Sequence, residues 1–264
     1  SCHLHLNTTY VRCVSYHDRL VDPVPVYPLN MAPDSVDDDY KNCSAEMSKL
    51  VDTACLPLEI FGIFEKAWIE AEKDTQGMKP KIDNLTISHA IALRVYTSPY
   101  PNMYEPFNDA VRTSRTNYKT TFKYHSLHFL LIDAIHRLNP KGECFQVYRG
   151  TDVEFKHQNT FMRFGTFTST SLDVKITIVF GSELCFEVRT CHGANVSKYS
   201  RYPEEKEVLI PPYETFKIKK VIKKGNGQTV MNCDTVYQLE STGIESNLRC
   251  LHPVQGFFLF KGSF

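Results

Sequence analysis

The strongest constraint on the fold is that the hydrophobic period of the sequence changes once, near Gly142. Before this glycine, apolar residues recur every three or four positions, which is typical of helices with one buried face. The expected helices span residues 40–52, 58–73, 107–118 and 121–138, and a further one follows Thr86. Pro140 and Gly142 end the last of these helices, because neither residue favours its continuation.

After Gly142 the apolar residues alternate with polar ones, as they do in strands with one buried face. The expected strands span residues 144–149, 165–171, 183–190, 205–210, 213–222 and 228–239. Gly225-Asn226-Gly227 is a hairpin turn signal between the last two strands. Helices in one half of the chain and strands in the other predict an α+β fold.

The length of 264 residues suits one large domain, and no internal repeat or low-complexity tract divides the chain. We expect residues 31–264 to form a single domain and the protein to be a monomer. Residues 1–30 carry three prolines and no sustained hydrophobic period, so they are expected to form an irregular N-terminal extension.

The overall charge and the length of the apolar stretches exclude two classes of protein. Thirty basic residues balance thirty acidic ones, whereas a nucleic-acid-binding protein normally carries a basic surface. The longest apolar stretches, Phe129–Ile132 and Phe257–Phe260, are far shorter than the roughly 18 residues that a transmembrane helix needs. We therefore expect neither a nucleic-acid partner nor a transmembrane segment.

Cysteines and glycosylation sequons favour an extracellular protein. The chain has nine cysteines without a Cys-x-x-Cys pair, so we expect no metal site. Four N-x-[ST] sequons begin at Asn7, Asn42, Asn84 and Asn195. Cysteines and sequons together are typical of secreted or cell-surface proteins, although a thiol-rich cytosolic protein with accidental sequons remains the alternative.

The most distinctive segment carries two glutamates that are two positions apart, Glu205 and Glu207, where an apolar strand begins. In a strand both would point to one face, about 7 Å apart, while Lys206 would point to the other. If Glu207 already lies in the sheet, Glu205 is instead the last residue of the loop that enters it. Like charges placed so close raise each other's pKa, which is unfavourable for stability but useful for a cationic substrate. Taken alone, the segment fits a solvated edge strand equally well.

Two further segments add polar groups that could share a site with these glutamates. Arg149-Gly150-Thr151 ends the first expected strand, and an arginine beside a glycine suits the binding of phosphate oxygens. Phe164-Gly165 precedes the next strand, which contains Thr168-Ser169-Thr170-Ser171 with its alternating hydroxyls. Each segment by itself is more often structural.

The order of an arginine, a Thr-Ser-x-Ser strand and a Glu-x-Glu segment resembles the R-S-E signature of the arginine-specific mono-ADP-ribosyltransferases. Further segments are similar to the vertebrate ecto-ADP-ribosyltransferases, and the likeness covers roughly residues 31–252. These segments are Asp37-Asp38-Asp39-Tyr40 followed by Cys43, Ala67-Trp68, Phe122-Lys123, His128-Phe129, Arg189-Thr190-Cys191-His192-Gly193 and Glu207-Val208-Leu209-Ile210-Pro211.

This resemblance implies a fold, a reaction and the residues that carry it. The fold would be a helical N-terminal half packed on a split mixed β-sheet core, with residues 31–264 as the catalytic domain. The reaction would transfer ADP-ribose from NAD or NADP to arginine side chains of extracellular proteins and release nicotinamide. Catalysis is expected from Arg149, Ser169, Glu205 and Glu207, and nucleotide binding from Arg149, Gly150, Thr151, Phe164, Ser169 and Glu207.

The resemblance also assigns individual roles. Arg149 would grip the diphosphate and nicotinamide ribose, and Ser169 would hold the catalytic Glu207 and the ribose. Glu207 would bind the 2′-hydroxyl of that ribose, and Glu205 would receive the guanidinium of the acceptor. In the loop over residues 194–204, Tyr199 and Tyr202 are the candidates for an aromatic contact with the substrate.

Cofactor, partners and location follow from the same resemblance. NAD would be a consumed substrate, with no permanently bound cofactor and no metal, and the partners would be arginine-bearing proteins. The enzyme would be extracellular, either secreted or held at the cell surface by a glycolipid anchor. Disulfides are implied between Cys43 and Cys250 and between Cys144 and Cys191. The alternatives are an NAD glycohydrolase and a catalytically silent interaction protein on the same fold.

Overall fold

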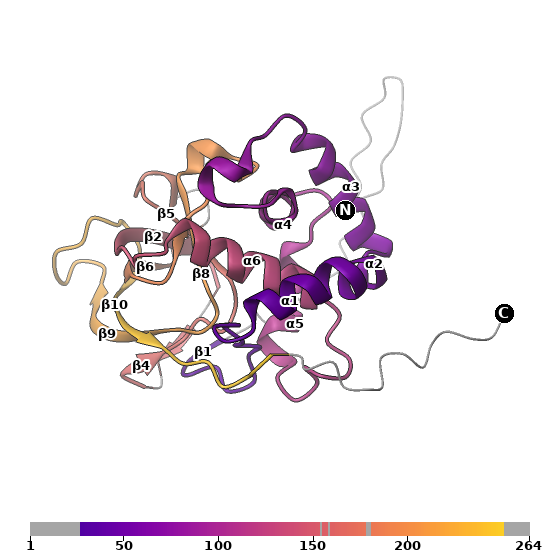
Figure 1. Ribbon diagram of the computed structural model, residues 1–264. Coiled ribbons are helices and arrows are strands. Elements are labelled where there is room, and N and C mark those ends of the chain that lie inside the picture. Colours follow the sequence, from indigo (N-terminus) through magenta and orange to yellow (C-terminus); the bar gives the residue numbers. More distant parts are fainter. Residues whose placement is uncertain (1–26, 154, 158, 178–180, 251–264) are drawn as a thin grey trace, which may run out of the picture.

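A computed structural model describes residues 27–153, 155–157, 159–177 and 181–250 of the chain. Figure 1 shows the helices gathered on one side and the strands on the other, with α6 between them. The helices are α1 Ser44–Leu50, α2 Leu56–Glu59, α3 Gly62–Asp74, α4 Ile87–Thr97, α5 Tyr104–Thr113 and α6 His125–Leu138. A π-helix, Val51–Cys55, joins α1 to α2, and a 3-10 helix, Pro80–Asp83, precedes α4.

The strands form an eight-stranded mixed sheet and a separate two-stranded one. Their bounds are β1 Tyr27–Leu29, β2 Phe145–Thr151, β3 Phe155–His157, β4 Phe161–Met162, β5 Thr168–Ser171, β6 Leu184–Thr190, β7 Ala194–Asn195, β8 Glu207–Ile210, β9 Glu214–Lys223 and β10 Thr235–Ile244. The large sheet has the order β4-β9-β10-β6-β2-β5-β8-β7, and β1 pairs with β3. Within the large sheet β10 and β6 run parallel, and the other neighbours run antiparallel.

The large sheet is nearly divided between β2 and β5. Seven pairs of residues join β2 to β6, but only Tyr148 and Ser171 pair β2 with β5 in the described part of the chain. The predicted α+β class and the split mixed sheet are therefore confirmed. This weak junction matters for function because the expected arginine and serine lie on the two strands that meet there.

Two apolar cores cover the two faces of the large sheet. On one face, α6 and α4 share a cluster with Phe167, which precedes β5, and with Leu209 of β8. On the other, Val147, Phe186 and Phe216 form a second cluster. Since both faces are covered, β8 is buried at every position, including Glu207.

Several predicted boundaries differ from the observed ones. The last of the first thirty residues are not irregular, because residues 27–29 form β1. The helix predicted from residue 58 begins at Gly62, since the chain is extended at Ile60 and Phe61. The strand predicted from residue 228 begins at Thr235, and residues 224–234 form a long connection that includes the expected glycine turn.

Within the described ranges, three disulfides hold segments that are distant in sequence. Cys43–Cys250 and Cys144–Cys191 confirm the implied pairs, and Cys185–Cys233 is a third, which the sequence had left open. Cys55 is free and buried. Cys2 and Cys13 lie outside the described residues.

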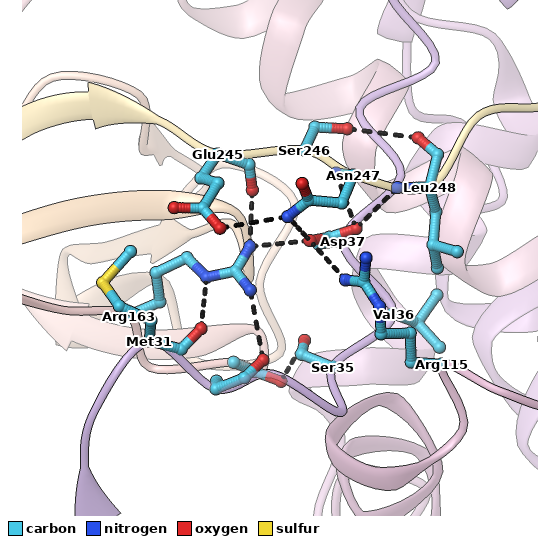
Figure 2. Close-up of polar contacts among 12 residues, drawn as sticks. Met31, Ser35, Val36, Asp37, Arg115, Arg163, Glu245, Ser246, Asn247 and Leu248 are labelled. Carbon is cyan, nitrogen blue, oxygen red and sulfur yellow. Dashed lines mark hydrogen bonds and ion pairs between the residues drawn. The ribbon is translucent and has the colours of Figure 1, made fainter.

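A buried ion pair joins the N-terminal turn to the sheet and to the C-terminal segment (Figure 2). Asp37, with its side chain fully buried, lies 2.7 Å from Nη1 of Arg163 and 3.1 Å from Nη1 of Arg115. The backbone N–H groups of Asn247 and Leu248 also donate to Asp37. Burial alone would raise the pKa of Asp37, but these donors outweigh it and lower the pKa.

The guanidinium of Arg163 completes this junction by donating to three backbone carbonyls. These belong to Met31, Ala32 and Glu245. Because the Arg163 side chain is only 1% exposed, its charge depends on Asp37 for compensation.

We expect Asp37→Asn to destabilise the protein by about 3–5 kcal/mol, because the buried charge of Arg163 loses its counter-charge. Thermal unfolding with the disulfides intact measures the effect. Asp34→Asn is the matched control, since Asp34 is exposed three positions earlier and its replacement should have little effect. Equal melting temperatures for the two variants would contradict this assignment.

Candidate active site

The four expected catalytic residues come together around one small cavity of about 30 Å³ at the junction of β2, β5 and β8. Its lining consists of Tyr148, Arg149, Ser169, Thr170, Ser171, Thr177, Glu205 and Glu207. The cavity holds little more than one water-sized group, so a larger ligand requires side chains at its mouth to move.

Arg149 bridges the gap between β2 and β5. Its Nη1 donates to the Ser169 carbonyl at 2.7 Å, and its Nη2 donates to the Tyr104 hydroxyl at 3.2 Å. Since Tyr148 and Ser171 alone pair these two strands among the described residues, the guanidinium occupies space that ladder hydrogen bonds would otherwise fill. Its remaining N–H groups give the cavity a fixed positive charge.

Glu207 is the first residue of β8 and is only 4% exposed. Burial raises the pKa of this carboxyl, while hydrogen bonds from the Ser169 and Ser200 hydroxyls and the charge of Arg149 oppose the rise. Glu205 contributes a smaller increase. The mutual repulsion expected from the sequence is therefore secondary to burial as the cause of the shift.

Glu205 reaches the cavity by a different route from the one that strand alternation implies. It ends a 3-10 helix, Pro203–Glu205, and Lys206 has a left-handed backbone with φ +50°, so the chain turns between the two glutamates. The Ser171 hydroxyl holds the Glu205 carbonyl at 2.7 Å. Partial burial, assisted by the charge of Glu204, raises the pKa of Glu205.

Lys206 neutralises neither glutamate, as the sequence predicts. Its Nζ lies 3.0 Å from Oδ2 of Asp173, and the side chain is largely exposed. The two carboxyl groups in the cavity therefore face a single cation, Arg149.

Three of the residues expected to bind the nucleotide do not line this cavity. A Cβ on Gly150 would lie 2.3 Å from the Gly181 carbonyl oxygen, so this glycine is required by close backbone packing. Thr151 is buried, and its hydroxyl accepts from the Val153 N–H. Phe164 packs edge-on against aromatic rings of the second core.

Two residues of the site were not found from the sequence. Tyr104 orients Arg149 from the start of α5. Ser200 is fully buried, and its hydroxyl hydrogen-bonds Glu207 and accepts from the Tyr202 N–H at 3.2 Å. A single tyrosine or serine carries no spacing signal, so only the folded chain reveals these contacts.

The loop that precedes Glu205 has its two aromatic candidates in different environments. Tyr199 is 2% exposed, and its hydroxyl donates to Asp83 at 2.5 Å, so it anchors the loop. Tyr202 is 36% exposed and available to a ligand. The exposed ring is therefore the candidate for a substrate contact.

Neither a metal site nor a membrane-spanning helix is found in the described residues. No cluster of three or more His, Cys, Asp or Glu side chains within those ranges could hold a metal ion. No described helix is long and apolar enough to cross a membrane.

Comparisons with known proteins place the chain in one enzyme family. A family model described as NAD:arginine ADP-ribosyltransferase matches residues 29–235. Ecto-ADP-ribosyltransferase 5 of Mus musculus is 34% identical over 220 residues, which cover 77% of this chain and 71% of that protein. The GPI-linked NAD(P)(+)–arginine ADP-ribosyltransferase 1 of Mus musculus is 35% identical over 215 residues, covering 72% and 64%.

Among solved structures, the chain is similar to the mono-ADP-ribosyltransferase ART2.2. The TM-score is 0.72 at 30% sequence identity, and the match covers 86% of this chain and 99% of that one. A mutant of ART2.2 in complex with NAD matches with a TM-score of 0.70. Over most of the chain the fold is therefore that of a mono-ADP-ribosyltransferase.

We expect Glu207→Gln to raise the melting temperature at neutral pH, because the buried carboxylate is ionised there at a cost in folding free energy. A raised pKa means that the folded state holds the proton more tightly than the unfolded state does, so stability falls as pH rises above the unfolded value. Glutamine removes this cost.

Thermal unfolding from pH 4 to pH 8 tests this prediction. The two proteins should converge near pH 4, where Glu207 is protonated, and separate as the pH rises. Parallel curves across the whole range would show that the charge of Glu207 carries no folding cost.

Proposed function

This chain belongs to the NAD:arginine ADP-ribosyltransferase family, and on that premise we propose which of its residues carry the transfer of ADP-ribose to arginine. The enzyme works outside the cell, consumes NAD and releases nicotinamide. The observation that supports the residue assignment best is the single cavity shared by Arg149, Ser169, Glu205 and Glu207.

Glu207 stabilises the developing cation. Breaking the bond between nicotinamide and ribose builds positive charge on the sugar, as in glycoside hydrolysis. A buried carboxylate that binds the ribose 2′-hydroxyl counters this charge where it forms, and because the site is shielded from water the effect is strong. The Ser169 and Ser200 hydroxyls hold the carboxylate in one orientation before substrate arrives.

Arg149 binds the diphosphate of NAD. A guanidinium suits phosphate because its N–H groups form parallel, charge-assisted hydrogen bonds. The contacts of Arg149 with the Ser169 carbonyl and the Tyr104 hydroxyl fix its plane, so less entropy is lost on binding. In this role Tyr104 is a positioning residue rather than a catalytic one.

Glu205 receives the acceptor arginine. Its carboxyl is half-buried at the mouth of the cavity, where it can bind a guanidinium through two hydrogen bonds. As the guanidinium nitrogen attacks the sugar carbon, that nitrogen must lose a proton, and Glu205 accepts it. The pKa of Glu205 is raised towards neutral pH, which makes its carboxylate a more effective general base at that pH.

The remaining features complete the proposal. The catalytic unit covers residues 31–264 as one domain and acts as a monomer. Its substrates are NAD or NADP and arginine-bearing proteins. A glycolipid anchor is the proposed attachment, since one similar protein is named as GPI-linked. Neither a resident cofactor nor a metal takes part in the proposed mechanism.

We expect wild-type protein to release nicotinamide from NAD and to label a small guanidine such as agmatine with ADP-ribose. Glu207→Gln should lower the rate by about 10²–10³-fold, the effect of removing one oriented electrostatic group. Isotopic labelling of both products measures the reaction. A wild-type enzyme that releases only free ADP-ribose would contradict arginine transfer and favour NAD hydrolysis.

We expect Glu205→Ala to separate the two outcomes of NAD cleavage. Transfer to agmatine should fall at least tenfold more than nicotinamide release does, because the variant keeps Glu207 and loses the acceptor's partner. Glu204→Ala is the matched control, since this neighbouring carboxylate is exposed and does not line the cavity. An equal loss of both activities in Glu205→Ala would assign Glu205 to the cleavage step.

A further inference from the structure

A second and larger cleft lies beside the candidate active site. It has a volume of about 630 Å³ and is bounded by α3, by the C-terminal end of α4 and the segment that follows it, and by the loop before Glu205. Lys66 and Ile69 contribute from α3, Tyr100 from the segment after α4, and Arg201 and Tyr202 from the loop. Nothing in the proposed reaction requires this cleft.

The cleft contains a buried arginine that forms no ion pair among the described residues, although Asp74 attracts it at longer range. Arg94 is 8% exposed, and its Nη1 donates to the Ser200 carbonyl at 2.8 Å. Its Nε is buried and has no hydrogen-bond partner. An unsatisfied N–H on a buried guanidinium is costly, so an acceptor atom supplied by a ligand would gain binding energy there.

The acidic residues around the cleft are already paired with other cations. Glu70 pairs with Lys73 at 2.9 Å, and Asp74 contacts the Arg201 guanidinium. No carboxylate in the described chain forms an ion pair with Arg94 or with the exposed Lys66. Three cations, Lys66, Arg94 and Arg201, therefore line the cleft against two carboxylates, Glu70 and Asp74, which leaves a surplus of one positive charge.

Short contacts connect the cleft to the candidate active site. The Ser200 carbonyl accepts from Arg94, while the Ser200 hydroxyl hydrogen-bonds Glu207. Tyr202 lines the cleft, and its carbonyl accepts from the Glu205 N–H at 3.1 Å. Tyr202 and Glu205 are separated by one turn of 3-10 helix, so their backbones lie roughly 6 Å apart along the helix axis.

We propose that this cleft binds an acidic side chain of the acceptor protein, close in sequence to the arginine that is modified. An extended peptide covers about 10 Å in three residues, so a carboxylate three positions from the modified arginine is the spacing that we expect to reach Arg94 and Lys66. The proposal rests on the proposed function, because it assumes that Glu205 receives the acceptor arginine. It adds a preference for the sequence around that arginine.

Two peptides that differ only in carrying Glu or Gln at two positions test the preference. Each has a single arginine in an alanine-rich sequence, with either Glu or Gln three positions away on both sides. We expect the wild-type enzyme to favour the Glu peptide about fivefold in kcat/KM. Lys66→Glu should abolish this preference, because it reverses the charge at the exposed rim, and should leave agmatine labelling unchanged.

Lys141→Glu is the matched control, since Lys141 is exposed and does not line the cleft. It should keep the fivefold preference. Arg94→Gln should also lose the preference, and its melting temperature reports any loss of folding. The proposal is overturned if the wild-type enzyme labels both peptides equally, or if Lys66→Glu retains the preference. Failure to label agmatine would instead contradict the proposed function.

Discussion

The hydrogen bond from Arg149 to the Ser169 carbonyl is the contact on which the candidate site depends. It spans the two strands that the large sheet joins by a single pair of residues in the described chain. A continuous ladder between β2 and β5 would fill this space with backbone hydrogen bonds and leave no cavity. Instead, the side chain of Arg149 holds the junction of β2 and β5, and its other N–H groups can bind a ligand. The same arginine therefore accounts both for the opening in the sheet and for the positive charge inside it.

The rest of the fold supports this opening from both sides. α6 and the helical layer cover one face of the sheet, and a second apolar core covers the other, so the strands around the cavity cannot relax into it. Gly150 allows the close packing of backbone behind Arg149. Ser200 connects the buried carboxylate of Glu207 to the loop that carries Tyr202 and Glu205.

The sequence predicted the class of fold and the four central side chains because those signals are local or ordered along the chain. The change of period near Gly142 and the order Arg149, Ser169, Glu207 are of this kind. Contacts between distant segments were not predictable in the same way. Ser200 and Arg94 have no motif, and their importance appears only when α4 packs beside the loop. Of the two readings of the Glu205 segment, the structure confirms the one in which Glu205 ends the loop and the strand begins at Glu207. The left-handed backbone at Lys206 has no signal in the sequence.

The central claim is that Ser169 and Glu207 act as one unit in cleaving NAD, and a double-mutant cycle on nicotinamide release tests it most directly. Ser169→Ala, Glu207→Gln and the double variant are compared with the wild-type enzyme under single-turnover conditions. If the serine works by orienting the carboxylate, the double variant will be about as slow as Glu207→Gln alone. Rate losses that multiply independently would show that the two residues do not share a function.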